Sequence, residues 1–178
     1  MKESRNKKRR QIIYAFIDSQ NLNLGTSKDI IRNKRKIYTG WKLDMKKFRI
    51  YLADKFRVSK AFLFLGYIPE NNNMYKLFKE FGYELVFKPT VKDADGKAKG
   101  NVDAEIVLHS ARLEYDLYDR GLFVSGDGDF LCLYKFLSQQ KKLKNIIIPN
   151  KHNASSLLKK FDKYKILLYS EKDKLVRK

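Results

Sequence analysis

Acidic side chains stand at three places in this sequence, two of which follow apolar segments. The four aspartates concerned are Asp18, Asp103, Asp127 and Asp129. Asp18 directly follows the apolar run Ile12–Ile17, and the pair Asp127 and Asp129 follows Gly121–Val124. Carboxylates held close together raise one another's pKa, and a hard divalent cation removes that repulsion. If the four converge, we expect a magnesium-type site that activates water against a phosphodiester.

Each member of this set also has a purely structural interpretation. Asp103 lies in the first turn of a predicted helix, where a carboxylate interacts favourably with the helix dipole. Asp127 and Asp129 could cap the helix that follows them. Asp18 is harder to explain this way, because a charge that closes a buried strand needs a partner. Asn21, one helical turn later, could supply an amide oxygen or orient a ligand.

Other catalytic and metal motifs are absent. Asp127-Gly128-Asp129 does not continue into an EF-hand, and the chain has no phosphate-binding glycine loop. The two histidines, His109 and His152, are too scattered for a zinc site. The single cysteine, Cys132, excludes a disulfide framework and is expected to be a small core residue.

The segments that carry these residues alternate between two types. Apolar runs typical of buried parallel strands are found at 12–17, 61–67, 85–87, 121–124, 146–148 and 166–169. Helical patterns lie between them, at 45–56 after Asp44, 74–81, 101–118 after Asn101, 130–140 and 154–161 after Asn153. This alternation predicts an α/β fold, with a mostly parallel central sheet and helices on both faces. Two polar stretches, at 22–42 and 90–100, interrupt the pattern as long loops at the ligand-binding edge of the sheet.

Length and charge limit the partners. The 178 residues fit one domain, and the net charge of +19 favours a polyanion such as nucleic acid. No apolar run approaches the roughly 20 residues that a membrane span needs, so we expect a cytoplasmic protein without a membrane partner. We divide the chain into a basic N-terminal arm at 1–10, a domain at 11–170 and a basic C-terminal tail at 171–178. The sequence leaves open whether the protein forms a homodimer.

Three segments resemble a known family. Ala15–Leu22, Lys99–Asp103 and Ser125–Phe130 are similar, in order and spacing, to the three signatures of NYN-domain (LabA-like) proteins in the PIN-like nuclease superfamily. The resemblance implies a PIN-like Rossmannoid sheet and an acidic Mg²⁺ or Mn²⁺ site. It places the four aspartates at the catalytic, metal-binding positions, with Asn21 and Ser125 in support. Many members carry an acid where this chain has His109, which suggests a packing or supporting role for that histidine.

The resemblance implies hydrolysis of RNA by metal-activated water. The basic residues expected to hold the RNA are Lys34, Arg35, Lys36 and Lys99. Tyr38 or Trp41 could stack a base, although core packing ahead of the Asp44 helix is the favoured interpretation of Trp41. Two other functions remain open: an RNA-binding adaptor that retains the acidic pocket, and a phosphatase or DNA-processing nuclease with the same carboxylate chemistry.

Overall fold

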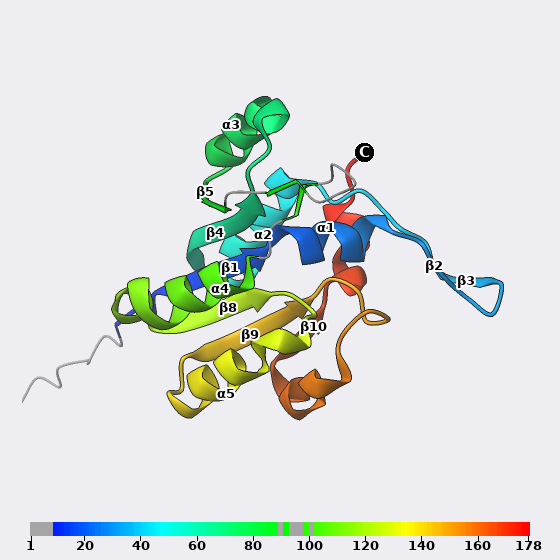
Figure 1. Ribbon diagram of the computed structural model, residues 1–178. Helices are drawn as coiled ribbons and strands as arrows, with labels where there is room; N and C mark the ends of the chain where they lie inside the picture. The colour runs from blue at the N-terminus through cyan, green and yellow to red at the C-terminus, as the bar shows by residue number, and fades with distance from the viewer. Residues whose placement is uncertain (1–8, 89–90, 93–97, 100–101) are drawn as a thin grey trace, which may run out of the picture.

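A parallel β-sheet forms the centre of the molecule. The computed structural model describes residues 9–88, 91–92, 98–99 and 102–178. Within these residues six parallel strands lie in the order β10-β9-β8-β1-β4-β5. Their bounds are β1 Ile13–Asp18, β4 Val58–Gly66, β5 Tyr83–Lys88, β8 Arg120–Val124, β9 Leu143–Ile148 and β10 Lys165–Leu167. The α/β fold with a mostly parallel sheet is confirmed (Figure 1).

The middle of the sheet is buried on both faces, which explains why β1 is apolar at every position before Asp18. Along β1, Ile13, Ala15 and Ile17 pack into one hydrophobic core, whereas Tyr14 and Phe16 pack into the other. Phe16 stacks on Phe62 and Phe123 of the neighbouring strands, with ring centroids 5.5 and 5.2 Å apart. These contacts fix the middle of the sheet.

Helices cover both faces. One core includes Leu22 of α1 (Ser19–Ser27), Phe48 of α2 (Met45–Phe56) and Tyr75 of α3 (Asn72–Glu80). The other includes Ile106 of α4 (Asp103–Leu108) and Leu137 of α5 (Leu131–Gln139). Short helical turns complete the path at η1 (Pro69–Asn71), η3 (Tyr115–Leu117) and η4 (Gly128–Phe130). As the sequence predicts, Asp44 caps α2, accepting a hydrogen bond of 3.0 Å from the Lys47 amide.

The stretch 22–42, expected to be a loop, is structured. Its first residues complete α1, and the rest forms an antiparallel hairpin of β2 (Ile30–Arg32) and β3 (Arg35–Tyr38). Asn33 and Lys34 form the turn, with positive φ values of 49° and 61°. The hairpin projects from the body of the molecule (Figure 1).

Three further segments and one single residue depart from the prediction. The helix predicted at 101–118 ends as α4 at Leu108, continues as a π-helical turn, η2 (His109–Leu113), and its predicted cap Asn101 lies outside the described residues. Ser155, not Asn153, caps the next segment, which is the 3-10 helix η5 (Ser156–Tyr164). The last predicted strand ends at Leu167 and turns into η6 (Leu168–Glu171). Cys132 is exposed on α5, so its assignment to the core was wrong.

The two ends of the chain differ. Residues 1–8 of the predicted arm lie outside the described part of the structure. The segment 171–178, expected to be a tail, packs on the domain: α6 (Lys172–Leu175) buries Leu175, and Val176 forms a β-bridge with Leu43. In the region 90–100, only the short strands β6 (Val91–Lys92) and β7 (Ala98–Lys99) are described. No helix within the described ranges has the length and apolar character needed to cross a membrane.

Candidate metal centre

The site lies where the order of the sheet reverses. From β1 the chain first adds β4 and β5 on one side, then β8, β9 and β10 on the other. Loops that leave the carboxyl ends of β1 and β8 therefore diverge, and such a point on an open α/β sheet is the usual place for a ligand. Asp18 ends β1, and Asp127 follows β8. The fold thus explains why residues more than a hundred positions apart share one site.

Three carboxylates come together there. Among the described residues, Asp103, Asp127 and Asp129 each place one oxygen within 4.8 Å of the others, and we call them the acidic cluster. Asp103 begins α4, and the other two flank Gly128 in the loop after β8. Asp129 is exposed and the other two are partly buried. The cluster is therefore open to solvent on one side and supported by protein on the other.

Local hydrogen bonds hold the loop after β8. The buried Ser125 hydroxyl accepts a hydrogen bond of 3.1 Å from the Asp127 amide. Asp127 Oδ1 in turn accepts one of 2.9 Å from the Asp129 amide, which directs both carboxylates toward the same side. Gly128 is needed between them, because a Cβ at this position would collide with the Ser155 side chain. Ser125 therefore supports the cluster through the backbone.

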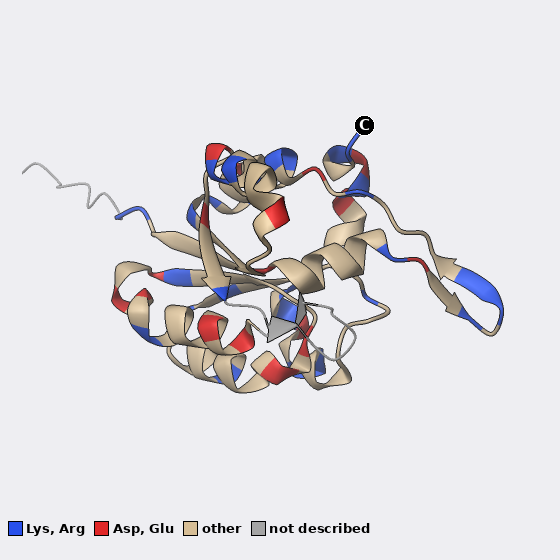
Figure 2. Cartoon of the chain, turned by 45° about the horizontal axis from the view of Figure 1, so that its top comes forward, with Lys and Arg blue, Asp and Glu red and all other residues tan. Residues whose placement is uncertain are grey.

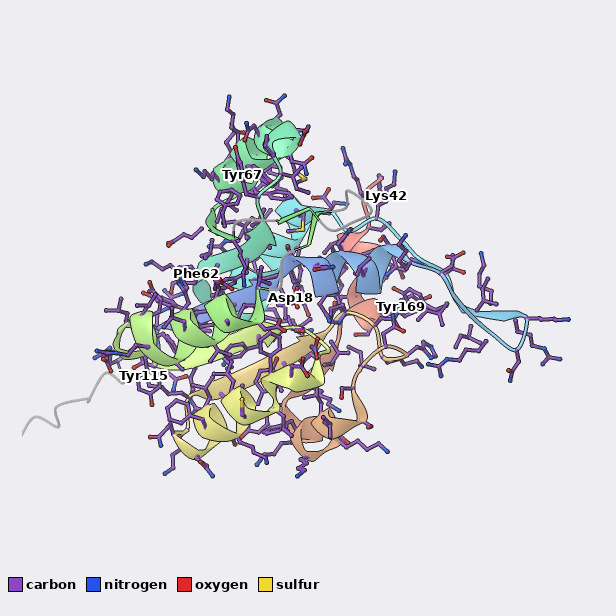
Figure 3. The ribbon with its side chains drawn as sticks, in the orientation of Figure 1. Asp18, Lys42, Phe62, Tyr67, Tyr115 and Tyr169 are labelled. Atoms are coloured by element: carbon purple, nitrogen blue, oxygen red, sulfur yellow. The ribbon has the colours of Figure 1, made fainter. Side chains whose placement is uncertain are left out.

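Asp18 lies beside the cluster but outside the 4.8 Å group. It caps α1, with Oδ1 accepting a hydrogen bond of 2.9 Å from the Asn21 amide, and it is only 6% exposed. Burial raises the pKa of its carboxyl from 3.8 to about 6, and the charges of Asp103 and Asp127 act in the same direction. Asp18 is therefore close enough to Asp103 and Asp127 for their charges to raise its pKa, while one of its oxygens accepts the hydrogen bond from α1. Figure 3 labels Asp18 where β1 meets α1.

Asn21 connects the two loops of the site. Its Oδ1 accepts a hydrogen bond of 2.9 Å from the Gly126 amide, which links α1 to the loop after β8. This oxygen is therefore engaged with the backbone. Asn21 positions the segment that carries Asp127, and we assign it an orienting role rather than that of a ligand.

The donor set suits a hard divalent cation. Within the described residues, neither Asp127 nor Asp129 forms an ion pair with Lys or Arg. The cluster thus offers several carboxylate oxygens within a small space. No lysine or arginine side chain of the described residues neutralises Asp127 or Asp129. Magnesium and manganese favour such oxygen ligands and retain water in their remaining positions. The residues present therefore fit the metal that the sequence predicts.

The cluster opens into a large pocket that sequence reasoning described only in part. All four aspartates line this pocket, whose volume is about 1380 Å³. Three basic residues line it too: Lys42, Lys46 and Arg177. No sequence pattern distinguishes them from the other lysines and arginines, of which the chain has 39 in all. They are well placed to meet an anionic ligand that approaches the acidic cluster.

A tyrosine hydroxyl lies beneath the cluster. Tyr134 of α5 is completely buried, and its hydroxyl has no hydrogen-bond partner among the described residues. Burial, followed by the charges of Asp18, Asp127 and Asp103, raises its pKa well above the usual value. Tyr134 is therefore a neutral donor next to negative charge, and in the sequence it looked like an ordinary core aromatic.

The other residues singled out in the sequence lie elsewhere. His109 packs edge-on against Phe64, with ring centroids 5.3 Å apart, so its contacts are those of a packing residue. Tyr38 and Trp41 are buried and joined by a hydrogen bond of 2.8 Å, so neither ring is free to stack a base. Lys34, Arg35 and Lys36 lie on the projecting hairpin, away from the cluster (Figure 2). The side chain of Lys99 lies outside the described residues.

Comparisons with known proteins agree with this architecture. A protein of unknown function from Vibrio parahaemolyticus, known from its crystal structure, superposes with a TM-score of 0.61 at 25% identity, over 85% of this chain and 89% of that chain. No curated protein matches significantly. The family model of the NYN domain matches residues 13–168, nearly the whole chain. The chain therefore belongs to the NYN domain family, a branch of the PIN-like superfamily with a nuclease-type fold.

Proposed function

We propose that this protein is a metal-dependent ribonuclease that hydrolyses RNA phosphodiester bonds. The acidic cluster carries the proposal: three carboxylates at the switch point of a nuclease-type sheet, open to a pocket with basic walls. Asp103, Asp127 and Asp129 would hold Mg²⁺ or Mn²⁺. Such an ion, when bound, lowers the pKa of a water molecule and offsets the charge that develops on the phosphate.

The protein residues have distinct tasks in this proposal. Ser125 and Asn21 keep the loop after β8 in place through the Asp127 and Gly126 amides. Asp18, whose carboxyl has a pKa of about 6, lies where it can orient a water or accept its proton. Lys42, Lys46 and Arg177 on the wall of the pocket would hold the phosphates on either side of the scissile bond. The hairpin residues Lys34, Arg35 and Lys36, with Lys99, would hold RNA further out.

The test is a cleavage assay on labelled single-stranded RNA, with Mn²⁺, Mg²⁺ or EDTA. We expect metal-dependent cleavage that is lost in EDTA and reduced at least about 100-fold by Asp127→Asn. Asp54→Asn is a matched control, because Asp54 is exposed on α2 and remote from the cluster. Its cleavage rate should equal that of the wild type.

Four results would contradict the proposal. RNA binding without cleavage in either metal would indicate an adaptor. Release of phosphate from small esters, with long strands left intact, would indicate a phosphatase. Preferential cleavage of DNA would indicate a DNA-processing nuclease. Equal activity of Asp127→Asn and the wild type would identify a contaminating nuclease.

A further inference from the structure

A second pocket lies at the same edge of the sheet. Its volume is about 370 Å³, and we call it the edge pocket. It lies between the base of the hairpin and the loops that follow β9 and β10. The lining residues that matter here are Lys36, Tyr38, Lys151, His152, Leu167 and Tyr169. Because all the strands of the sheet are parallel, this pocket opens at the same edge as the acidic cluster.

The walls of the edge pocket combine aromatic and basic groups. The Tyr169 ring packs against Tyr38 on one side, with centroids 5.3 Å apart, yet the residue is 47% exposed. His152 approaches Tyr38 from another direction, at 6.3 Å. Lys151 is exposed and forms no ion pair within the described residues, whereas Lys36 is paired with Asp29 at 2.5 Å. Tyr169 thus offers a partly exposed ring, over which the Lys172 ammonium lies 5.4 Å from the centroid, and Lys151 lines the same pocket. Aromatic rings and ammonium groups in one pocket are what base stacking and phosphate binding use.

Hydrogen bonds between separate segments hold the pocket in shape. Arg32 of the hairpin donates to the His152 carbonyl at 2.8 Å. The Asn150 side chain donates to the Gly25 carbonyl at 3.0 Å and accepts from the His152 amide at 3.0 Å. Gly25 permits this close approach, because a Cβ there would lie 2.6 Å from Pro149 Cβ. Three segments are thus joined around the pocket before any ligand binds.

The edge pocket and the acidic cluster lie at opposite ends of α1. Asp18 caps the helix at one end, and at the other the Thr26 carbonyl accepts a hydrogen bond from the Tyr38 hydroxyl, at 3.4 Å. Nine helical residues span about 13 Å. The three strand spacings from β1 to β10 give a similar value, about 14 Å. Figure 3 labels Asp18 and Tyr169, which mark the two sites.

We propose that the edge pocket binds one nucleotide of a single-stranded RNA whose scissile phosphate lies at the acidic cluster. The base stacks on Tyr169, its phosphate meets Lys151, and a few nucleotides of extended strand follow α1 between the two sites. This subsite rests on the proposed ribonuclease function. It gives that function a substrate class: single strands long enough to reach both sites, rather than short oligonucleotides or duplexes.

Length-dependent binding tests the subsite without requiring cleavage. Fluorescent oligouridylates of two and eight nucleotides are titrated against the full chain in EDTA, with anisotropy as the readout. We expect the octamer to bind at least about tenfold more tightly than the dimer. Lys151→Glu should remove most of that advantage, and Tyr169→Ala should reduce it about fivefold or more. Lys135→Glu, an exposed position on α5, is the charge-matched control and should stay within about twofold of the wild type.

The outcomes separate the subsite from the proposed catalysis. Equal affinity of wild type for dimer and octamer, or octamer binding that survives Lys151→Glu, overturns the subsite even if RNA is cleaved in Mn²⁺. Loss of the length advantage in both pocket variants supports the subsite even if no metal produces cleavage. Because Lys151 is exposed, its substitution tests the pocket even if Tyr169→Ala does not fold.

Discussion

At the scale of single residues, Asp18 serves two conflicting needs. Its carboxylate caps α1, yet it is buried beside other acids. The raised pKa of about 6 shows that the ionised form is unfavourable in this place. A carboxyl whose pKa is higher in the folded than in the unfolded chain destabilises the fold once both forms ionise. The loss in the free energy of unfolding is absent below about pH 4, grows as the pH rises to about 6, and reaches its full size above about pH 6.

Replacement of Asp18 by Asn should therefore stabilise the metal-free protein at neutral pH. Asn caps helices as well as Asp does, so the variant keeps the hydrogen bond from the Asn21 amide. The gap between 3.8 and about 6 corresponds to at most about 3 kcal/mol in the free energy of unfolding. We expect Asp18→Asn to be more stable than wild type at pH 7.5 and equal to it near pH 4, in urea unfolding with EDTA.

The same variant should lose cleavage and keep RNA binding. If it is less stable at pH 7.5 and still cleaves, Asp18 is only a structural cap.

Tyr134 gives a second prediction at this scale. Its buried hydroxyl has no partner among the described residues, so Tyr134→Phe should increase the free energy of unfolding of the metal-free protein by about 1 kcal/mol. Tyr118→Phe is the matched control, because the Tyr118 hydroxyl donates to the Ser110 carbonyl at 2.6 Å. That variant should lose a similar amount of stability. Two losses of equal size would mean that the Tyr134 hydroxyl has an acceptor in solution, with Asp18 the first to examine.

At the scale of elements, the hairpin β2–β3 is an exposed basic unit. Arg32 and Arg35 stand opposite each other across its two strands, next to Lys34 and Lys36 (Figure 2). Like charges in this arrangement repel one another, and an anionic partner relieves that repulsion. The hairpin therefore has the charge expected of an element that contacts nucleic acid, outside the pocket that holds the carboxylates.

Reversal of the hairpin charge should weaken RNA binding for every sequence. The triple variant Lys34→Glu, Arg35→Glu and Lys36→Glu should bind RNA less tightly, and its affinity should depend less steeply on salt concentration. Its free energy of unfolding should change little, because these side chains are exposed. The control reverses three exposed lysines on other elements: Lys135, Lys159 and Lys163. Similar losses in both variants would show that only the net charge of the protein matters.

The sequence predicted the elements with strong patterns and missed those without. The central strands were found because both of their faces are buried along most of their length, which produces continuous apolar runs. The hairpin was missed because its strands are short, basic and exposed, and its turn is Asn33-Lys34 instead of the usual Asn-Gly. In the site, Asp18, Asp127 and Asp129 could be inferred from their place after strand ends, and Asp103 from its place at the start of a helix after a polar loop. Lys42, Lys46 and Arg177 could not, because only the fold brings these residues to the pocket.

At the scale of the whole molecule, opposite charges are separated in space. The chain carries a net charge of +19, yet several of its acids gather at one point of the sheet edge. A polyanion attracted by the basic surface would be repelled at that point unless a cation occupies it. Metal at the cluster should therefore add to the RNA affinity that the basic surface already provides in EDTA, because the ion compensates for the negative charge of the cluster.

This arrangement predicts that metal stabilises the entire fold. Asp103 comes from the start of α4, whereas Asp127 and Asp129 come from the loop after β8, so an ion bound to all three joins segments that unfolding would separate. A ligand that binds only the folded chain, at 100 times its dissociation constant, adds about 2.7 kcal/mol to the free energy of unfolding. We expect Mn²⁺ to produce an increase of this order in urea unfolding, and EDTA to remove it. Asp127→Asn should abolish the increase, and Asp54→Asn should retain it. Mn²⁺ that stabilises Asp127→Asn as much as wild type would place the metal away from the acidic cluster, and the hydrolytic function would then lose its chemical basis.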